Sequence, residues 1–141
     1  MRLNSYKKSN SIIYLLSLTL LFFSSVSFAQ QTCKLPAQAK PEVTKRYIQC
    51  LDDQLNTAKQ LQNTWIQKRK FELNKLEFET GNTQILQLFI KSIASNENYI
   101  KHSCQWRYSL KLPNALTAAI TYKTCELSLV EQFTLDLKRP L

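Results

Sequence analysis

The sequence has 141 residues, 19 of them basic and 10 acidic, which gives a formal charge of +9 at pH 7. It contains one histidine and one glycine. This composition excludes most sites that need a catalytic histidine or a glycine-rich phosphate loop, so we do not expect an enzyme. The length suits one small domain after a leader segment.

Residues 1–29 have the pattern of a secretory signal peptide. A basic front is followed by the uncharged apolar run 12–23, and small residues precede Gln30 at the −3 and −1 positions. The apolar run is short for a membrane span, which needs about 20 residues, so an uncleaved anchor is the less favoured alternative. The polar residues before Cys33 do not suit a lipid-modified cysteine.

We therefore expect a soluble protein exported to the periplasm or secreted, with residues 30–141 forming a single helical domain. Its formal charge is +6, because three of the basic residues leave with the leader. A basic exported protein favours anionic surfaces and acidic proteins as partners, although spread-out charge also serves plain solubility.

The first expected element is a long helix after the polar lead-in that Pro36 and Pro41 bracket. Between residues 47 and 78, apolar side chains recur every three or four residues, which is typical of an amphipathic helix. These side chains are Leu51, Leu55, Ala58, Leu61, Trp65, Leu73 and Leu76. Pro41 suits the first turn and Gly81 suits a left-handed end. The basic run 68–70 is expected to form a solvated patch.

A second helix is predicted from about Gln84 to Cys104, with Asn82 or Thr83 as its N-cap. Its apolar face comprises Leu86, Phe89, Ile93, Ile100 and Cys104. The segment 105–114 breaks this pattern and is expected to be a loop, because Pro113 stops or starts an element.

A third helix is predicted from Ala115 to about Leu137, with Asn114 as its N-cap. Its apolar stripe comprises Ala118, Tyr122, Cys125, Leu129 and Phe133. Sequential helices joined by short turns pack antiparallel, and the chain has no alternating pattern long enough for a strand. The expected fold is all-α: a small antiparallel three-helix bundle with a long first helix, joined by two disulfides.

Four cysteines, Cys33, Cys50, Cys104 and Cys125, lie outside the leader, and an even count in a small exported domain indicates two disulfides. The intervening segments of 16, 53 and 20 residues and the single histidine argue against the rival zinc site, so no metal or cofactor is expected. Four cysteines allow three pairings. A bond between Cys33 and Cys50 is within reach, since eight extended residues cover the ~14 Å along the helix.

Few residues suit catalysis. A histidine-dependent nucleophile would have to use His102, which we expect at the surface, and the neighbouring Cys104 is expected to be oxidised. Asp52 and Asp53 are adjacent on a helix and point to different sides, so they do not form a carboxylate pair. Charge alone permits nucleic-acid binding, but an exported disulfide-bonded protein rarely meets nucleic acid, and none is expected.

The expected loop carries the candidate partner-binding residues Trp106, Arg107, Tyr108 and Lys111. Trp, Tyr and Arg dominate the hot spots of protein interfaces, and a Cys104–Cys125 bond would fix the start of the loop. The alternative is that Trp106 and Tyr108 cap the end of the bundle core.

The spacing of the four cysteines and the segment Ala118–Leu127 resemble the LprI-type lysozyme-inhibitor domain family, whose members are small exported helical domains. Leu137 matches the closing leucine of that family. The resemblance implies the local pairing, Cys33–Cys50 and Cys104–Cys125, which we prefer. It also implies inhibition of a lysozyme or a related cell-wall hydrolase, and Trp106–Lys111 is then the candidate inhibitory loop.

The alternative function is a non-inhibitory periplasmic adaptor or secreted effector. Such a protein would bind an anionic surface or an acidic protein partner through its basic residues. Lys68, Arg69 and Lys70 would then matter more than Trp106, and binding would depend strongly on salt.

Overall fold

A computed structural model describes residues 33–36 and 39–141. The predicted signal peptide, residues 1–29, lies outside the described residues. The described chain forms three helices, α2 (Pro41–Thr80), α3 (Gln84–Ser109) and α4 (Ala115–Lys138), and contains no strand in this part. The predicted all-α bundle with a long first helix is therefore confirmed.

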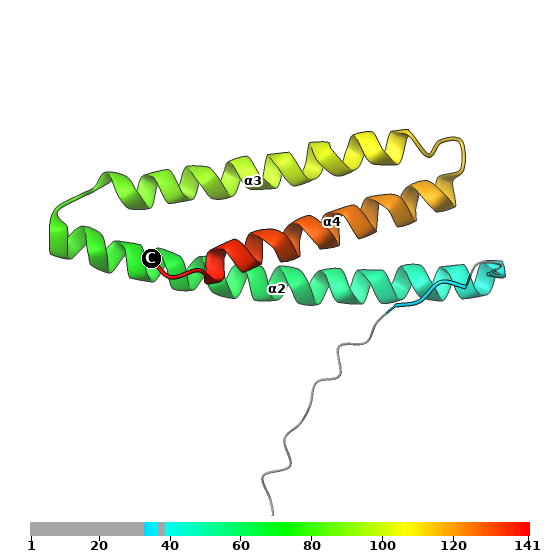
Figure 1. The fold of residues 1–141 in the computed structure, drawn as a ribbon, viewed down its shortest axis with the longest axis horizontal. Coiled ribbons are helices and arrows are strands. Elements are labelled where there is room, and N and C mark those ends of the chain that lie inside the picture. Colours follow the sequence, from blue (N-terminus) through cyan, green and yellow to red (C-terminus); the bar gives the residue numbers. More distant parts are fainter. Residues whose placement is uncertain (1–32, 37–38) are drawn as a thin grey trace, which may run out of the picture. The chain divides into compact units, whose positions relative to one another are not determined.

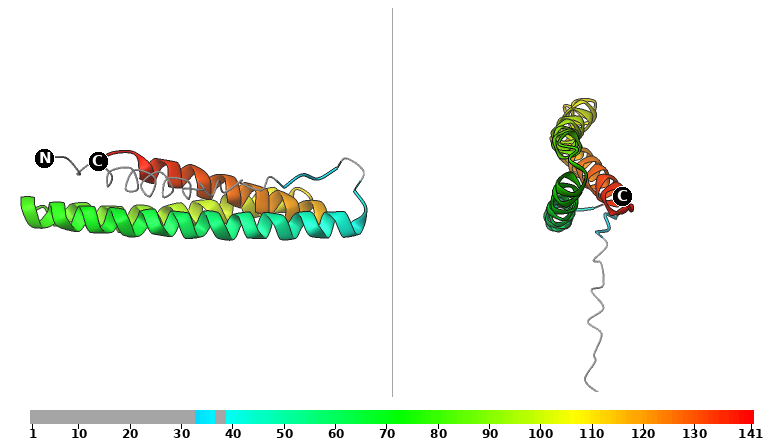
Figure 2. Two further views of the ribbon diagram at one scale, coloured as in Figure 1. Left: turned by 90° about the horizontal axis from the view of Figure 1, so that it is seen from below. Right: turned by 90° about the vertical axis from the view of Figure 1, so that its left-hand side faces the viewer.

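The three helices run back and forth, and α4 lies between the other two (Figure 1). α3 returns antiparallel to α2 after a short turn, and α4 returns antiparallel to α3. α4 packs against both α2 and α3, and the end-on view of Figure 2 shows this order of helices. The shared core contains Leu55 from α2, Ile100 and Cys104 from α3, and Val130 from α4.

The ends of α2 and the start of α4 follow the local signals in the sequence. Pro41 occupies the first turn of α2, and Gly81 ends this helix at a φ of 72°, donating its N–H to the carbonyl of Glu77. The side chain of Asn114 accepts a hydrogen bond of 3.0 Å from the backbone N–H of Thr117 and so caps α4. All three of these predictions are confirmed.

α3 is longer than predicted: it continues past Cys104 to Ser109, and the turn is confined to residues 110–114. The prediction of a loop over 105–114 was therefore wrong in its first half. Residues 105–109 include neither glycine nor proline, so nothing in the backbone interrupts the helix. The backbone N–H of Leu110 still bonds to the carbonyl of Trp106.

The buried face of α2 differs from the predicted apolar stripe most clearly at Leu61 and Arg69. Leu51, Leu55 and Leu73 are buried as expected, whereas Leu61 is 44% exposed and Arg69 is only 7% exposed. Arg69 follows Leu51 by about five full helical turns and therefore lies on the same buried face, whereas Leu61 is turned about 80° away from that face. Arg69 belongs to the interface with α4, and the predicted solvated patch is wrong at this residue.

Both preferred disulfides are present. Cys33 and Cys50 join the lead-in to α2 with their Cα atoms 5.9 Å apart, and Cys104 and Cys125 join α3 to α4 at 5.6 Å. Cys104 has no exposed surface and belongs to the core. The second disulfide therefore joins the two helices covalently within the core.

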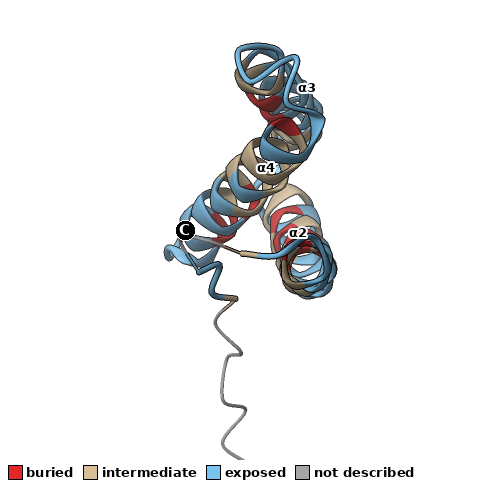
Figure 3. Ribbon diagram, turned by 90° about the vertical axis from the view of Figure 1, so that its right-hand side faces the viewer, coloured by how far each residue is buried: buried red, intermediate tan, exposed pale blue. Residues whose placement is uncertain are grey.

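Burial is concentrated where α4 faces its neighbours (Figure 3). Large apolar side chains also remain exposed, among them Phe71, Phe78, Trp106 and Leu110. None of the helices in the described ranges is long and apolar enough to cross a membrane.

Candidate functional site

The four predicted partner-binding residues lie at the end of the bundle where α3 turns into α4. Trp106, Arg107 and Tyr108 occupy the last turns of α3, and Lys111 follows in the connecting turn. Because three of them are helical, they point in different directions around the α3 axis. The structure therefore divides them between two surfaces.

The first surface is the outer one, formed by Trp106, Arg107, Leu110, Lys111 and Leu112, which we call the tip surface. The guanidinium carbon of Arg107 lies 4.3 Å from the centre of the Trp106 ring, a cation–π contact. Nη1 of Arg107 also donates to the carbonyl of Ser103 at 2.7 Å. Arg107 is half-buried and is thus held in place beside the exposed indole.

Trp106 does not cap the bundle core. Its side chain is 53% exposed, and the neighbouring Leu110 and Leu112 are 70% and 52% exposed. Lys111 is exposed between these two leucines. A cation flanked by large exposed apolar groups on a short turn is an arrangement suited to contact with another protein.

The second surface is a groove of about 450 Å³ along the seam between α3 and α4. Lys101, Gln105 and Tyr108 line it from α3, since residues four and seven apart share a helix face. Ala119, Tyr122 and Lys123 line it from α4.

The walls of the groove are packed against one another. The rings of Tyr108 and Tyr122 meet edge to face, with centres 6.5 Å apart and planes at 83°. The alternative that both Trp106 and Tyr108 cap the bundle core therefore does not hold for the pair: Tyr108 packs on the bundle, and Trp106 does not. The Cys104–Cys125 bond joins the same two helices beside the groove, so its walls are covalently held.

The two lysines of the groove differ in their electrostatic surroundings. Nζ of Lys123 pairs with the carboxylate of Asp52 on α2, and Lys59 of α2 pairs with Glu126 of α4 at 2.6 Å. Lys101 is exposed and forms no ion pair within the described part of the chain. The groove therefore carries one uncompensated positive charge.

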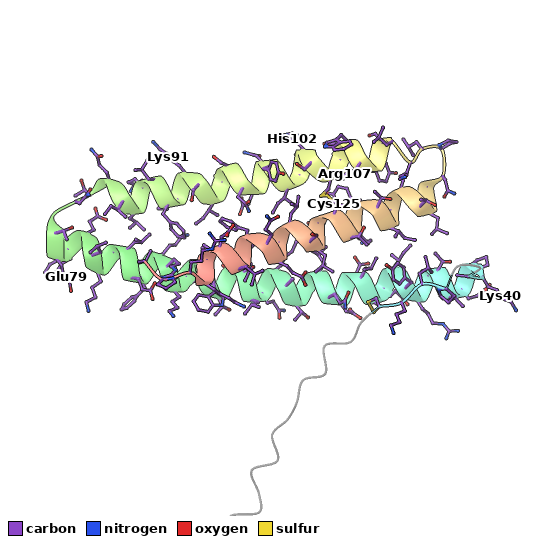
Figure 4. The ribbon with its side chains drawn as sticks, viewed as in Figure 1. Lys40, Glu79, Lys91, His102, Arg107 and Cys125 are labelled. Carbon is purple, nitrogen blue, oxygen red and sulfur yellow. A yellow bond between two sulfur atoms is a disulfide. The ribbon has the colours of Figure 1, made fainter. Side chains whose placement is uncertain are left out.

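Candidate catalytic and metal-binding groups were also located. His102 is exposed on α3, as predicted, and appears on its outer side in Figure 4. Asp52 faces α4, whereas Asp53 is exposed, so the two carboxylates point to different sides. Among residues 33–36 and 39–141, no three His, Cys, Asp or Glu side chains lie close enough together to hold a metal ion.

Sequence reasoning missed most of the groove. Lys101 and Gln105 precede Tyr108 by seven and three residues, and this spacing is meaningful only if the helix continues beyond Cys104. Ala119 and Tyr122 were available as a helical pair on α4, but Tyr122 was assigned to the core stripe. A prediction that α3 continues as a helix past Cys104 would have placed Lys101, Gln105 and Tyr108 on one face, next to the pair on α4.

No protein-family model matches this chain, and neither a curated protein nor a solved structure matches it. The resemblance to LprI-type domains therefore stays a prediction, and the function has to be argued from the two surfaces.

Proposed function

We propose that the chain is an exported binding protein that inhibits a lysozyme or a related cell-wall hydrolase through its tip surface. The observation that supports this proposal best is the exposed Trp106 beside the fixed guanidinium of Arg107, on a helix held to its neighbour by a disulfide. A preorganised tip loses little conformational entropy on binding.

The chemistry of the target supports the same assignment. Most glycoside hydrolases place two carboxylic acid side chains on either side of the bond they cleave, so the cleft itself concentrates negative charge. Lys111 and Arg107 would bring positive charge to that cleft, and the exposed leucines and the indole would cover its walls. Local attraction of this kind can oppose the general repulsion between a protein of charge +6 and a basic lysozyme.

The test is an inhibition titration against lysozymes of several classes at low and moderate salt, with the protein expressed from its full sequence and purified in oxidised form. We expect saturable inhibition that is lost when the disulfides are reduced. Trp106→Ala should weaken inhibition at least tenfold, because buried interface tryptophans often contribute more than ~1.4 kcal/mol.

Tyr99→Ala is the matched control, because Tyr99 is an aromatic residue of the same helix, 58% exposed and outside the tip surface. Inhibition should stay unchanged in this variant. Equal inhibition by the wild-type protein and Trp106→Ala would rule out the tip surface, and no inhibition of any class would rule out the proposed function.

A second candidate function is a non-inhibitory adaptor or secreted effector on an anionic surface, and two exposed phenylalanines of α2 favour it. Phe71 and Phe78 are 71% and 91% exposed and lie seven residues apart on one face, with Lys75 between them. Exposed aromatic rings beside a lysine suit the interface of an anionic bilayer. Arg69 is buried and cannot take part.

Co-sedimentation with vesicles of phosphatidylglycerol and phosphatidylcholine tests this second candidate. Binding that weakens as salt is added supports it, since screening reduces surface attraction. Absence of binding at low salt excludes a lipid surface.

A further inference from the structure

The groove between α3 and α4 is separate from the tip surface that inhibition would use. It has an apolar floor and walls, formed by Ala119 and the rings of Tyr108 and Tyr122, and a polar rim that includes Lys101 and Gln105. We infer that this groove binds an acidic segment of a partner protein, with an aromatic or aliphatic side chain between its carboxylates.

Charge complementarity is the first argument for an acidic occupant. Lys123 is already neutralised by Asp52, whereas Lys101 has no carboxylate partner in the described part of the chain. An ammonium group at the edge of an apolar surface attracts a carboxylate more strongly than it does in open water, because the neighbouring low-dielectric wall reduces screening. A side-chain carboxylate of the partner would complete this ion pair.

The unused hydrogen-bonding groups of the groove are the second argument. The hydroxyl groups of Tyr108 and Tyr122 and the side-chain amide of Gln105 form no hydrogen bond within residues 33–36 and 39–141. These groups can donate to carboxylates or to backbone carbonyls of a bound segment. Donors along both sides of an apolar floor suit a peptide backbone.

The length of the groove is the third argument, and it favours a peptide segment over a small carboxylic acid. From Lys101 to Tyr108 the helix rises about 10 Å, at 1.5 Å for each residue. An extended chain covers that distance with about three residues. When the central apolar side chain of the bound segment packs on Ala119 and the two tyrosines, the next residue of that segment therefore lies level with Lys101.

The rigidity of the groove is the fourth argument. Cys104 is fully buried and bonded to Cys125, which fixes α3 to α4, and α4 also packs along α2, where Lys123 pairs with Asp52 and Lys59 with Glu126. A preformed groove need not be ordered when the partner binds, so a short segment can bind with useful affinity.

The experiment uses the oxidised protein, expressed from its full sequence, and a fluorescein-labelled peptide of sequence Gly-Glu-Phe-Glu-Gly with blocked ends. Binding is followed by fluorescence anisotropy and by the backbone amide signals in NMR spectra. We expect saturable binding with signal changes concentrated at Lys101, Gln105, Tyr108, Ala119 and Tyr122. The peptide with Gln in place of Glu, and the one with Ala in place of Phe, should each bind at least fivefold more weakly.

Two pairs of variants test the location. Lys101→Gln should weaken binding at least fivefold, whereas Lys91→Gln, an exposed lysine of the same helix outside the groove, should leave it unchanged. Ala119→Phe should fill the floor and abolish binding, whereas Ala94→Phe, at an exposed position of α3, should not. Helix content and the absence of free thiols confirm folding in each case.

Three results would overturn the inference. One is equal loss of binding in Lys101→Gln and Lys91→Gln, which would indicate attraction to overall charge. Another is equal affinity for the peptide and for free N-acetylphenylalanine, which would indicate a small-carboxylate site. The last is the absence of signal changes in the groove at millimolar peptide. None of these results depends on whether the protein inhibits a lysozyme, since Trp106 is unchanged throughout.

Discussion

The guanidinium of Arg69 joins the middle of α2 to the end of α4. Its Nε donates to the carbonyl of Leu137 at 2.7 Å, its Nη2 donates to the carbonyl of Arg139, and its Nη1 pairs with Glu72 at 2.5 Å. The last carbonyls of a helix have no partner within the helix, so this one buried side chain satisfies groups that would otherwise need water. A basic residue in a run of three was expected at the surface, and its burial follows from these acceptors.

Replacing Arg69 with Met should destabilise the fold, because the carbonyls of Leu137 and Arg139 and the carboxylate of Glu72 lose their donor. The expected cost is about 2 kcal/mol in the free energy of unfolding. Urea titration followed by circular dichroism measures it. Arg46→Met, at an exposed position of the same helix, is the control and should change stability by less than about 0.5 kcal/mol. A cost equal to that of the control would show that the three hydrogen bonds contribute no net stability.

At the scale of the elements, the two disulfides act on different parts of the bundle. Cys33–Cys50 joins the lead-in to a single helix, and both of its residues are half-buried. Cys104–Cys125 joins two helices; Cys104 has no exposed surface, and Cys125 is half-buried. The two bonds therefore differ both in what they hold and in how easily a reductant reaches them.

Mild reduction should open Cys33–Cys50 first, because a thiolate can approach either of its half-buried cysteines, whereas in the other bond Cys104 is fully buried and only Cys125 is partly accessible. Mass spectrometry after alkylation identifies which cysteines have been released at each concentration of reductant. The helix content should change little at that first step, since the bond holds no pair of helices together. Release of Cys104 and Cys125 before or together with the other pair would contradict this order.

At the scale of the whole bundle, burial is unequal along its length. α4 ends at Lys138, and Arg69 marks the level on α2 that its last turn reaches. α4 does not extend beyond that level, and none of residues 74–99 is buried in the described part of the chain. Phe78, Leu88 and Ile90 are among the exposed side chains of this part.

Hydrogen exchange should reveal this inequality. Backbone amides in residues 74–93 should exchange markedly faster than those of residues 100–108 and 118–130, because local opening there exposes little additional apolar surface. Exchange of the oxidised protein followed by mass spectrometry of its peptides provides the comparison. Uniform protection along α2 and α3 would contradict it, and would indicate that something covers the exposed side chains in solution.

The sequence predicted correctly the features that depend on neighbouring residues. Gly81 ends α2 because it lacks a Cβ and adopts a positive φ without strain, and Asn114 caps α4 because its side chain reaches the N–H of Thr117. Apolar spacing predicted three helices, and the preferred cysteine pairing, which the family resemblance implied, is present in the structure.

The remaining features depend on how the helices lie against one another, and local patterns do not encode that. The apolar pattern that ended near Cys104 could not show that α3 continues to Ser109, so the segment carrying Trp106 and Tyr108 was taken for a loop. Arg69 is buried and Leu61 exposed because α4 packs on the face of α2 that carries Leu51 and Arg69, and Leu61 is turned about 80° away from it. The groove likewise exists only because Lys101 and Tyr108 of α3 meet Tyr122 of α4, two helices whose separation and rotation are decided by packing.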